Sequence, residues 1–306
     1  TWLNLHTFGG VLIRPLGDRP DAKMNPGDLA IFEQVEAWMT EHTGYPTVSG
    51  YHEFLYEPDK PLHGDLSDYA YHQRGALAYV VELWDLFKQL GIERKKPFVD
   101  HYAKITRKDL RALAELDRTQ NAGRLFKPWR KVQHPQLGEV EVGGYDPRVG
   151  IWNPPLERLD ETCRAQSAAF LRVAALVPRL ELQVQSVTHD SPGGPARIEL
   201  RLVNHGYLGS CGLPSAKALP HAEPLRLTVQ AEDGARLLAP TEAVVQIGHL
   251  EGWGSGLYGG SSVFSPWTRG NAHERFITLL AQGPGRLRVQ VESCRVGRME
   301  VEVVLA

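Results

Sequence analysis

The sequence of 306 residues predicts an α/β domain, then a partly helical connector, then an antiparallel β-sandwich. Over residues 1–92, short apolar runs typical of strands alternate with helically spaced segments, which is the pattern of an α/β domain. Residues 93–178 contain two longer helical patterns, and the stretch over 94–131 is rich in basic side chains. Over residues 179–306 the apolar period falls to two, with Gly, Pro and Asn turns between the runs, which predicts antiparallel sheets packed face to face.

The elements of the first region have recognisable signals at their ends. Residues 3–7 predict a strand that delivers His6 into a turn of small residues. Asn25 is suited to cap a helix with Pro26 in its first turn, and Gly44 is suited to end that helix. The other expected elements are a strand over 11–13, a helix over 67–74 that ends at Gly75, and a buried strand over 76–83.

The connector is expected to hold two helices. The first passes through Leu110, Leu113 and Leu116 within a basic stretch, which favours a solvated helix face over a patch for an anionic partner. The second runs over 156–177 and ends before Pro178. Its apolar stripe includes Cys163, so core packing explains this cysteine better than chemistry.

The connector also contains a predicted turn over 134–138 that leads into a short strand over 139–142.

The last region predicts strands joined by turns. Its glycine-rich segment over 249–260 is expected to be a long loop. The strands with the clearest alternation are expected over 180–184, 198–202, 225–229, 287–291 and 299–305.

Composition excludes several classes of function. The chain has 34 Lys and Arg against 36 Asp and Glu, so it lacks the basic excess that nucleic-acid binding requires. No stretch reaches the roughly 18–20 apolar residues that span a bilayer, so we expect no membrane span. The three cysteines are far apart and form no metal-binding pair. We expect them to be buried apolar residues of a cytoplasmic protein.

Two residues of the first region are candidates for chemistry. His6 lies at the end of a predicted strand, and the ends of α/β strands line the binding crevices of open sheets. Glu82 is a single carboxylate within the apolar run 78–84. Because a buried carboxylate without a partner is costly, we expect Glu82 to face a cavity, a metal-bound water or a cation.

With the motifs between them, these residues resemble the zinc carboxypeptidases of the carboxypeptidase A type. The family's His-Ser/Thr-Phe/Tyr motif corresponds to His6-Thr7-Phe8, and its Arg/Tyr-Pro pair to Arg14-Pro15. The family's Gly-Asp-x-x-Asp-Trp-x-Tyr motif corresponds to residues 64–71, and Glu82-Leu83 begins eleven residues after Tyr71, as in the family. The resemblance covers about the first 92 residues and implies the C-terminal half of a mixed-sheet peptidase domain.

The resemblance implies a role for individual residues. His6 corresponds to the third ligand of a catalytic Zn²⁺, and Glu82 to the general base that takes a proton from the zinc-bound water. Tyr56 is the nearest candidate for the family's mobile tyrosine, with an insertion before Gly64. The pocket for the C-terminal side chain of a peptide or protein substrate corresponds to Asp65, Leu66 and Ser67.

One part of the family pattern is absent. The first two zinc ligands come from a His-x-x-Glu pair, and none of the 12 histidines is followed by Glu three residues later. The chain therefore supplies one of the three protein ligands that catalytic zinc normally needs. We expect it to be the C-terminal part of a longer zinc-dependent metallocarboxypeptidase, with weak zinc binding and little activity alone. The alternative is a non-catalytic module that binds a protein or glycan on a degenerate peptidase scaffold.

Overall fold

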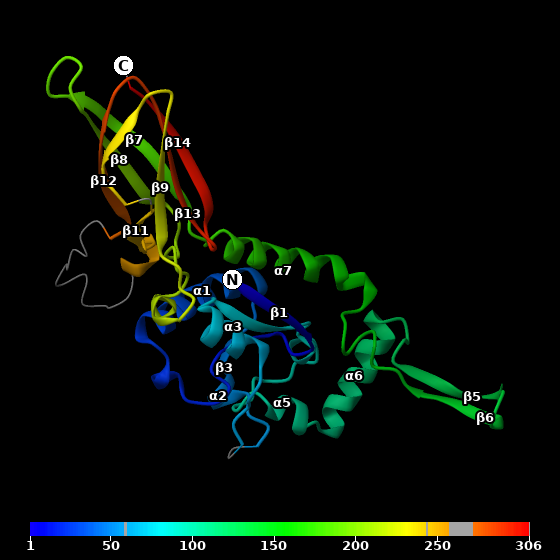
Figure 1. Ribbon diagram of the computed structural model, residues 1–306. Helices are drawn as coiled ribbons and strands as arrows, with labels where there is room; N and C mark the ends of the chain where they lie inside the picture. Colours follow the sequence, from blue (N-terminus) through cyan, green and yellow to red (C-terminus); the bar gives the residue numbers. More distant parts are fainter. Residues whose placement is uncertain (58–59, 243, 257–271, 306) are drawn as a thin grey trace. The chain divides into compact units, whose positions relative to one another are not determined.

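The computed structural model describes residues 1–57, 60–242, 244–256 and 272–305 and divides the chain into two compact units. As expected, the protein has a mixed α/β region followed by antiparallel sheets (Figure 1). Within the described residues no helix combines the length and apolar character needed to cross a membrane. The N-terminal unit comprises residues 1–24, 32–72 and 78–174, and the C-terminal unit comprises residues 25–31, 73–77 and 175–306.

A mixed sheet forms the centre of the N-terminal unit, with strand order β1-β4-β2-β3. Strand β4 pairs in parallel with β1 and antiparallel with β2, and β2 pairs in parallel with β3. Strand β3 was not predicted, because three residues are too few to show an apolar alternation. The strands are β1 (Trp2–Thr7), β2 (Val11–Arg14), β3 (Thr47–Ser49) and β4 (Ala78–Leu83).

Helix α1 (Pro26–Thr43) begins and ends where the sequence predicts. The side-chain oxygen of Asn25 accepts hydrogen bonds from the backbone N–H groups of Gly27 and Asp28, which caps the helix. Gly44 follows the helix with a φ of 69°, a conformation that glycine adopts without strain. Helix α3 (Leu66–Arg74) agrees with the predicted helix to within one residue, and the short helix α2 (Gly50–Glu53) precedes it.

The other regular elements of the N-terminal unit are helices and one hairpin. Strands β5 (Phe126–His134) and β6 (Gly138–Tyr145) extend away from the mixed sheet, so the short strand expected over 139–142 is one arm of a longer hairpin (Figure 1). The helices are α4 (Leu86–Gln89), α5 (Asp100–Ala103), α6 (Arg107–Gln120) and α7 (Leu159–Ala174), with short 3₁₀ turns at Asp21–Lys23 and Leu156–Arg158.

The predicted packing of Cys163 is wrong. Cys163 is exposed on α7, whose buried residues are Gln166, Ala169 and Val173. Leu159, four residues before Cys163 in the same helix, is also exposed. The first turns of α7 therefore lack a packing partner among the described residues, and the buried part of the helix begins at Gln166. Of the other two cysteines, Cys211 is buried as expected and Cys294 is exposed.

The C-terminal unit contains two four-stranded antiparallel sheets in the described residues, with strand orders β10-β12-β8-β7 and β11-β9-β13-β14. The five strands with clear alternation are confirmed as β7, β8, β9, β13 and β14. Part of the expected loop over 249–260 lies outside the described residues. The strands are β7 (Leu180–His189), β8 (Ala196–Asn204), β9 (Leu225–Glu232), β10 (Arg236–Ala239), β11 (Val244–Gly248), β12 (Glu274–Gln282), β13 (Gly285–Ser293) and β14 (Gly297–Leu305), with 3₁₀ turns at Pro214–Ala218 and Trp253–Gly256.

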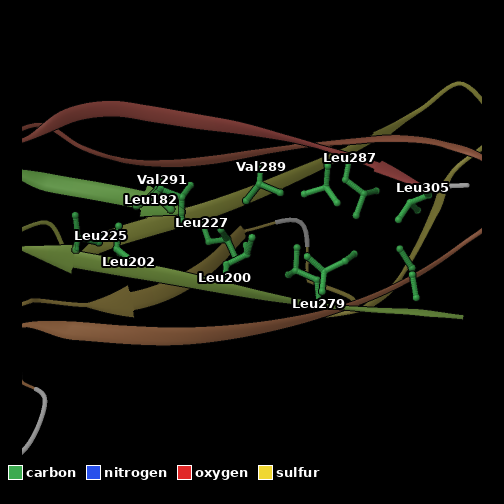
Figure 2. Packing of buried hydrophobic residues seen from close by; sticks show 14 of the residues in the cluster. Leu182, Leu200, Leu202, Leu225, Leu227, Leu279, Leu287, Val289, Val291 and Leu305 are labelled. Atoms are coloured by element: carbon green, nitrogen blue, oxygen red, sulfur yellow. The ribbon is translucent and has the colours of Figure 1, made fainter. Parts of the chain in front are cut away.

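The two sheets of the C-terminal unit share one apolar core. Leu200 of β8 and Leu279 of β12 come from one sheet, and Leu227 of β9 and Leu287 of β13 come from the other (Figure 2). Each of these side chains is at most 1% exposed. Full burial of such a side chain stabilises a fold by roughly 1.5–3 kcal/mol. The apolar residues at every second position of these strands form this core, which explains the alternation in the sequence.

Candidate active site

The pairing of β1 with β4 brings together the candidate metal ligand His6 and the candidate general base Glu82. His6 is the register partner of Glu82, and the His6 Nδ1 atom lies 3.6 Å from Glu82 Oε1. The two side chains differ in exposure, at 47% for His6 and 10% for Glu82. A half-open imidazole therefore stands next to a nearly buried carboxyl group.

The carboxyl group of Glu82 is unusual in its surroundings. Its Oε2 atom is buried and has no hydrogen-bond partner among the described residues. Burial raises the pKa of Glu82 from its usual value near 4.5 to about 7. A carboxyl group with such a pKa can both accept and release a proton near neutral pH, as a general acid–base catalyst must.

A cavity of about 160 Å³ opens beside this pair within the N-terminal unit. Its lining unites residues from distant parts of the sequence, and five of the six predicted site residues are among them. Leu66 is the exception, because it is 47% exposed and does not line the cavity. The predicted residues that line it are His6, Tyr56, Asp65, Ser67 and Glu82.

Tyr56 lies at the exposed side of this cavity. It is 65% exposed, while Phe54, two residues earlier, is buried and also lines the cavity. Partial burial and the nearby Glu82 carboxyl raise the pKa of the Tyr56 phenol, so its hydroxyl group stays protonated and can donate a hydrogen bond.

Asp65 and Ser67 form a small polar cluster at the start of α3. Asp65 Oδ1 accepts a hydrogen bond of 2.6 Å from the backbone N–H of Ser67 and another from the Ser67 hydroxyl group. One turn on, Asp68 Oδ2 accepts a 3.0 Å hydrogen bond from the backbone N–H of Gly17, and burial raises the pKa of Asp68. This side of the cavity is therefore lined by acidic and hydroxyl groups.

Arg14 also lines the cavity, although sequence reasoning gave it no role in the site. Its guanidinium donates hydrogen bonds to Asp21 Oδ2 at 3.2 Å and to Glu36 Oε2 at 3.1 Å. Asp21 in turn accepts a 2.8 Å hydrogen bond from the Ser49 hydroxyl group. Two acidic side chains thus hold the guanidinium of Arg14, and burial raises the pKa of one of them, Glu36, to about 7. The adjacent pair Arg14-Pro15 was the signal that could have placed this residue here.

The residues present fit a metal site only in part. His6 offers a half-exposed nitrogen ligand that lines the cavity, and the Glu82 carboxyl group lines the same cavity 3.6 Å away. However, the described residues contain no group of three His, Cys, Asp or Glu side chains able to hold a metal ion. Since catalytic zinc normally takes three protein ligands, these residues supply an incomplete set.

Comparison with known proteins concerns the other end of the chain. Residues 179–304 match a family described as a domain of unknown function (DUF8731), which is less than half of the chain. No curated protein matches the sequence. The match includes the antiparallel strands of the C-terminal unit and none of the residues that line the cavity.

Proposed function

We propose that the cavity is part of the active site of a zinc-dependent metallocarboxypeptidase, which removes the C-terminal residue of a peptide or protein. The observation that carries this proposal is the convergence of residues from three separate stretches of sequence. His6, Tyr56 and Glu82 all line one cavity, together with Asp65 and Ser67. The sequence resemblance singled out six residues, with Tyr56 only the nearest candidate for its role, and all but Leu66 line the cavity. A fortuitous resemblance gives no reason for these five to meet.

In this proposal Glu82 is the group that moves a proton. With a pKa of about 7, its carboxylate accepts a proton from the attacking water and then returns it to the leaving amine. His6 would supply one nitrogen ligand to zinc. When bound, zinc would polarise the scissile carbonyl and make water a better nucleophile.

The other cavity residues would bind and orient the substrate. The exposed hydroxyl group of Tyr56 can donate a hydrogen bond to the peptide, and Asp65 and Ser67 would contact the C-terminal side chain. The acidic lining favours substrates whose C-terminal side chain is polar or cationic over acidic ones.

The remaining ligands would come from outside the described residues, in a longer form of the protein. Strand β1 is an edge strand in the described part of the sheet, and its apolar side chains Trp2 and Leu5 are 39% and 50% exposed. An edge strand with exposed apolar side chains is suited to pair with a further strand. We propose that residues 1–92 are half of a carboxypeptidase domain, completed by strands that carry the missing His-x-x-Glu pair, and that the C-terminal sheets form a β-sandwich.

The test is to measure zinc content and release of C-terminal amino acids from a peptide library. It compares this chain with the longest protein that its gene encodes. We expect stoichiometric zinc and activity in the extended protein only. In that protein Glu82→Gln should lower activity at least about a hundredfold. Glu139→Gln, on the exposed hairpin, serves as the control and should leave activity unchanged.

Two results would contradict the proposal. Tight zinc binding and robust hydrolysis by this chain alone would show that the described residues hold a complete site. Absence of zinc and activity from both proteins would instead favour a non-catalytic module that binds a protein or glycan.

A further inference from the structure

The turn that follows His6 is held by two hydrogen bonds. Strand β1 ends at Thr7, so Phe8 and Gly9 lie beyond its pairing with β4. The backbone N–H of Gly9 donates to the carbonyl oxygen of Trp84 at 3.1 Å, which ties the turn to the end of β4. The hydroxyl group of Tyr102 donates to the carbonyl oxygen of Phe8 at 2.5 Å. One of the two bonds therefore comes from a side chain remote in sequence.

Tyr102 belongs to α5, beyond the first 92 residues that resemble the peptidases. Its ring meets the ring of Phe8 edge-on at 5.6 Å between centroids, and the ring of Phe54 in the same manner at 6.2 Å. Phe54 lies two residues before Tyr56, and Phe8 lies two residues after His6. Edge-to-face aromatic pairs have a preferred geometry, so Tyr102 fixes both chain segments relative to each other.

Gly9 lies between Tyr102 and Glu82. A methyl group added at Gly9 would collide with the Tyr102 hydroxyl group and would lie 3.2 Å from the Cβ atom of Glu82. Such close approach of the backbone requires glycine at this position. The backbone at Gly9 therefore fits between the Tyr102 hydroxyl group and the Glu82 side chain, with no room for a larger residue.

We propose that Tyr102 is a positioning residue that sets the relative placement of His6 and Glu82 through Phe8 and Gly9. The proposal rests on the proposed function for its effect on catalysis. Tyr102 does not line the cavity, so it acts through the turn and not by touching a substrate. Burial and the nearby Glu82 raise the pKa of its phenol, which keeps the hydroxyl group protonated as a donor.

Tyr102→Phe removes the hydroxyl group and keeps the ring. A matched control is Tyr79→Phe, because the Tyr79 hydroxyl group also donates to a backbone carbonyl oxygen, that of Phe32, at 2.9 Å. Tyr79 does not line the cavity. Both variants lose one hydrogen bond from a tyrosine to the backbone, so a general effect on stability should appear in both.

The first measurement follows the imidazole signals of His6 in this chain by NMR. Histidine is isotope-labelled, and the His6 signal is assigned from a His6→Gln variant. We expect Tyr102→Phe to move the His6 signals and Tyr79→Phe to leave them in place. Equal shifts in the two variants, or no shift in Tyr102→Phe, would overturn the proposal.

The second measurement uses the extended protein. Because a small displacement of catalytic groups lowers turnover steeply, Tyr102→Phe should lower kcat by about tenfold with little change in KM. Tyr79→Phe should leave both constants nearly unchanged. An unchanged kcat in Tyr102→Phe would contradict the proposal even with full zinc content. If the extended wild-type protein is inactive, the proposed function fails, and the His6 signals still decide whether Tyr102 positions His6.

Discussion

Strands β4 and β13 place their charged residues in opposite ways. In β13, Leu287 is fully buried, while the outward Arg288 approaches Glu300 of β14, with Nε and Oε1 3.4 Å apart. In β4 the first five residues are all buried, and one of them is Glu82. The charged side chains of β13 are partly exposed and pair with charged side chains of the neighbouring strands, whereas Glu82 is buried beside a half-exposed histidine.

The residues of β13 stabilise the fold, whereas burial of Glu82 carries a cost in free energy. The alternation of β13 satisfies apolar burial and charge solvation together, so stability alone accounts for its sequence. An apolar side chain in place of Glu82 would avoid the desolvation of a carboxyl group. Buried groups with perturbed pKa values are frequent at catalytic sites, and the position of Glu82 fits that pattern.

The largest effect should come from the core of the C-terminal sheets. Leu287→Ala removes a fully buried side chain and should lower the free energy of unfolding by about 2–5 kcal/mol. Val304→Ala, on the neighbouring strand β14, is the control because Val304 is 71% exposed. The free energy of unfolding of both variants is measured by denaturant titration, with circular dichroism as the signal. Equal losses in the two variants would contradict a core located at Leu287.

The ion pair on the outer face of β13 should contribute much less. A double-mutant cycle with Arg288→Ala and Glu300→Ala should give a coupling free energy of about 0.2–1 kcal/mol. Since both side chains are about two-fifths exposed, high salt should reduce this coupling further. A coupling free energy as large as the loss of unfolding free energy in Leu287→Ala would contradict this expectation. The exposed charges of β13 would then contribute as much to stability as its buried core.

Strong periodic patterns made much of the fold predictable. Helix α1 was fixed at both ends by Asn25 and Gly44, and the alternating strands of the C-terminal unit were located from period two. Strand β3 and the length of the β5–β6 hairpin were missed. Three residues carry too little pattern, and the hairpin strands are mostly exposed and so have no continuous apolar face.

The candidate site was predictable where motifs existed and not elsewhere. His6 and Glu82 were chosen from motifs, and their register pairing places them side by side. Tyr102 carries no local signal, because its contact with Phe8 spans 94 residues and depends on tertiary packing. Cys163 shows the opposite failure, since its apolar stripe has helical spacing but is buried only from Gln166 onward, which depends on tertiary packing.

We expect Glu82 to lower the stability of the folded protein at neutral pH, because burial disfavours its charged form. Its folded pKa of about 7 lies above the usual value near 4.5, so the folded protein retains the proton where the unfolded chain has lost it. The stability contributed by neutral Glu82 is therefore full below pH 4.5 and lost as the pH rises through about 7. At about 1.4 kcal/mol per unit, the loss is about 3 kcal/mol.

The most direct measurement is the free energy of unfolding of wild type and Glu82→Gln against pH, with a chelator to keep both metal-free. The glutamine does not titrate, so the difference between the two proteins should change by about 3 kcal/mol between pH 4.5 and about 8, in favour of the variant at the higher pH. Glu139→Gln should follow wild type across this range. Parallel curves for wild type and Glu82→Gln would contradict this expectation.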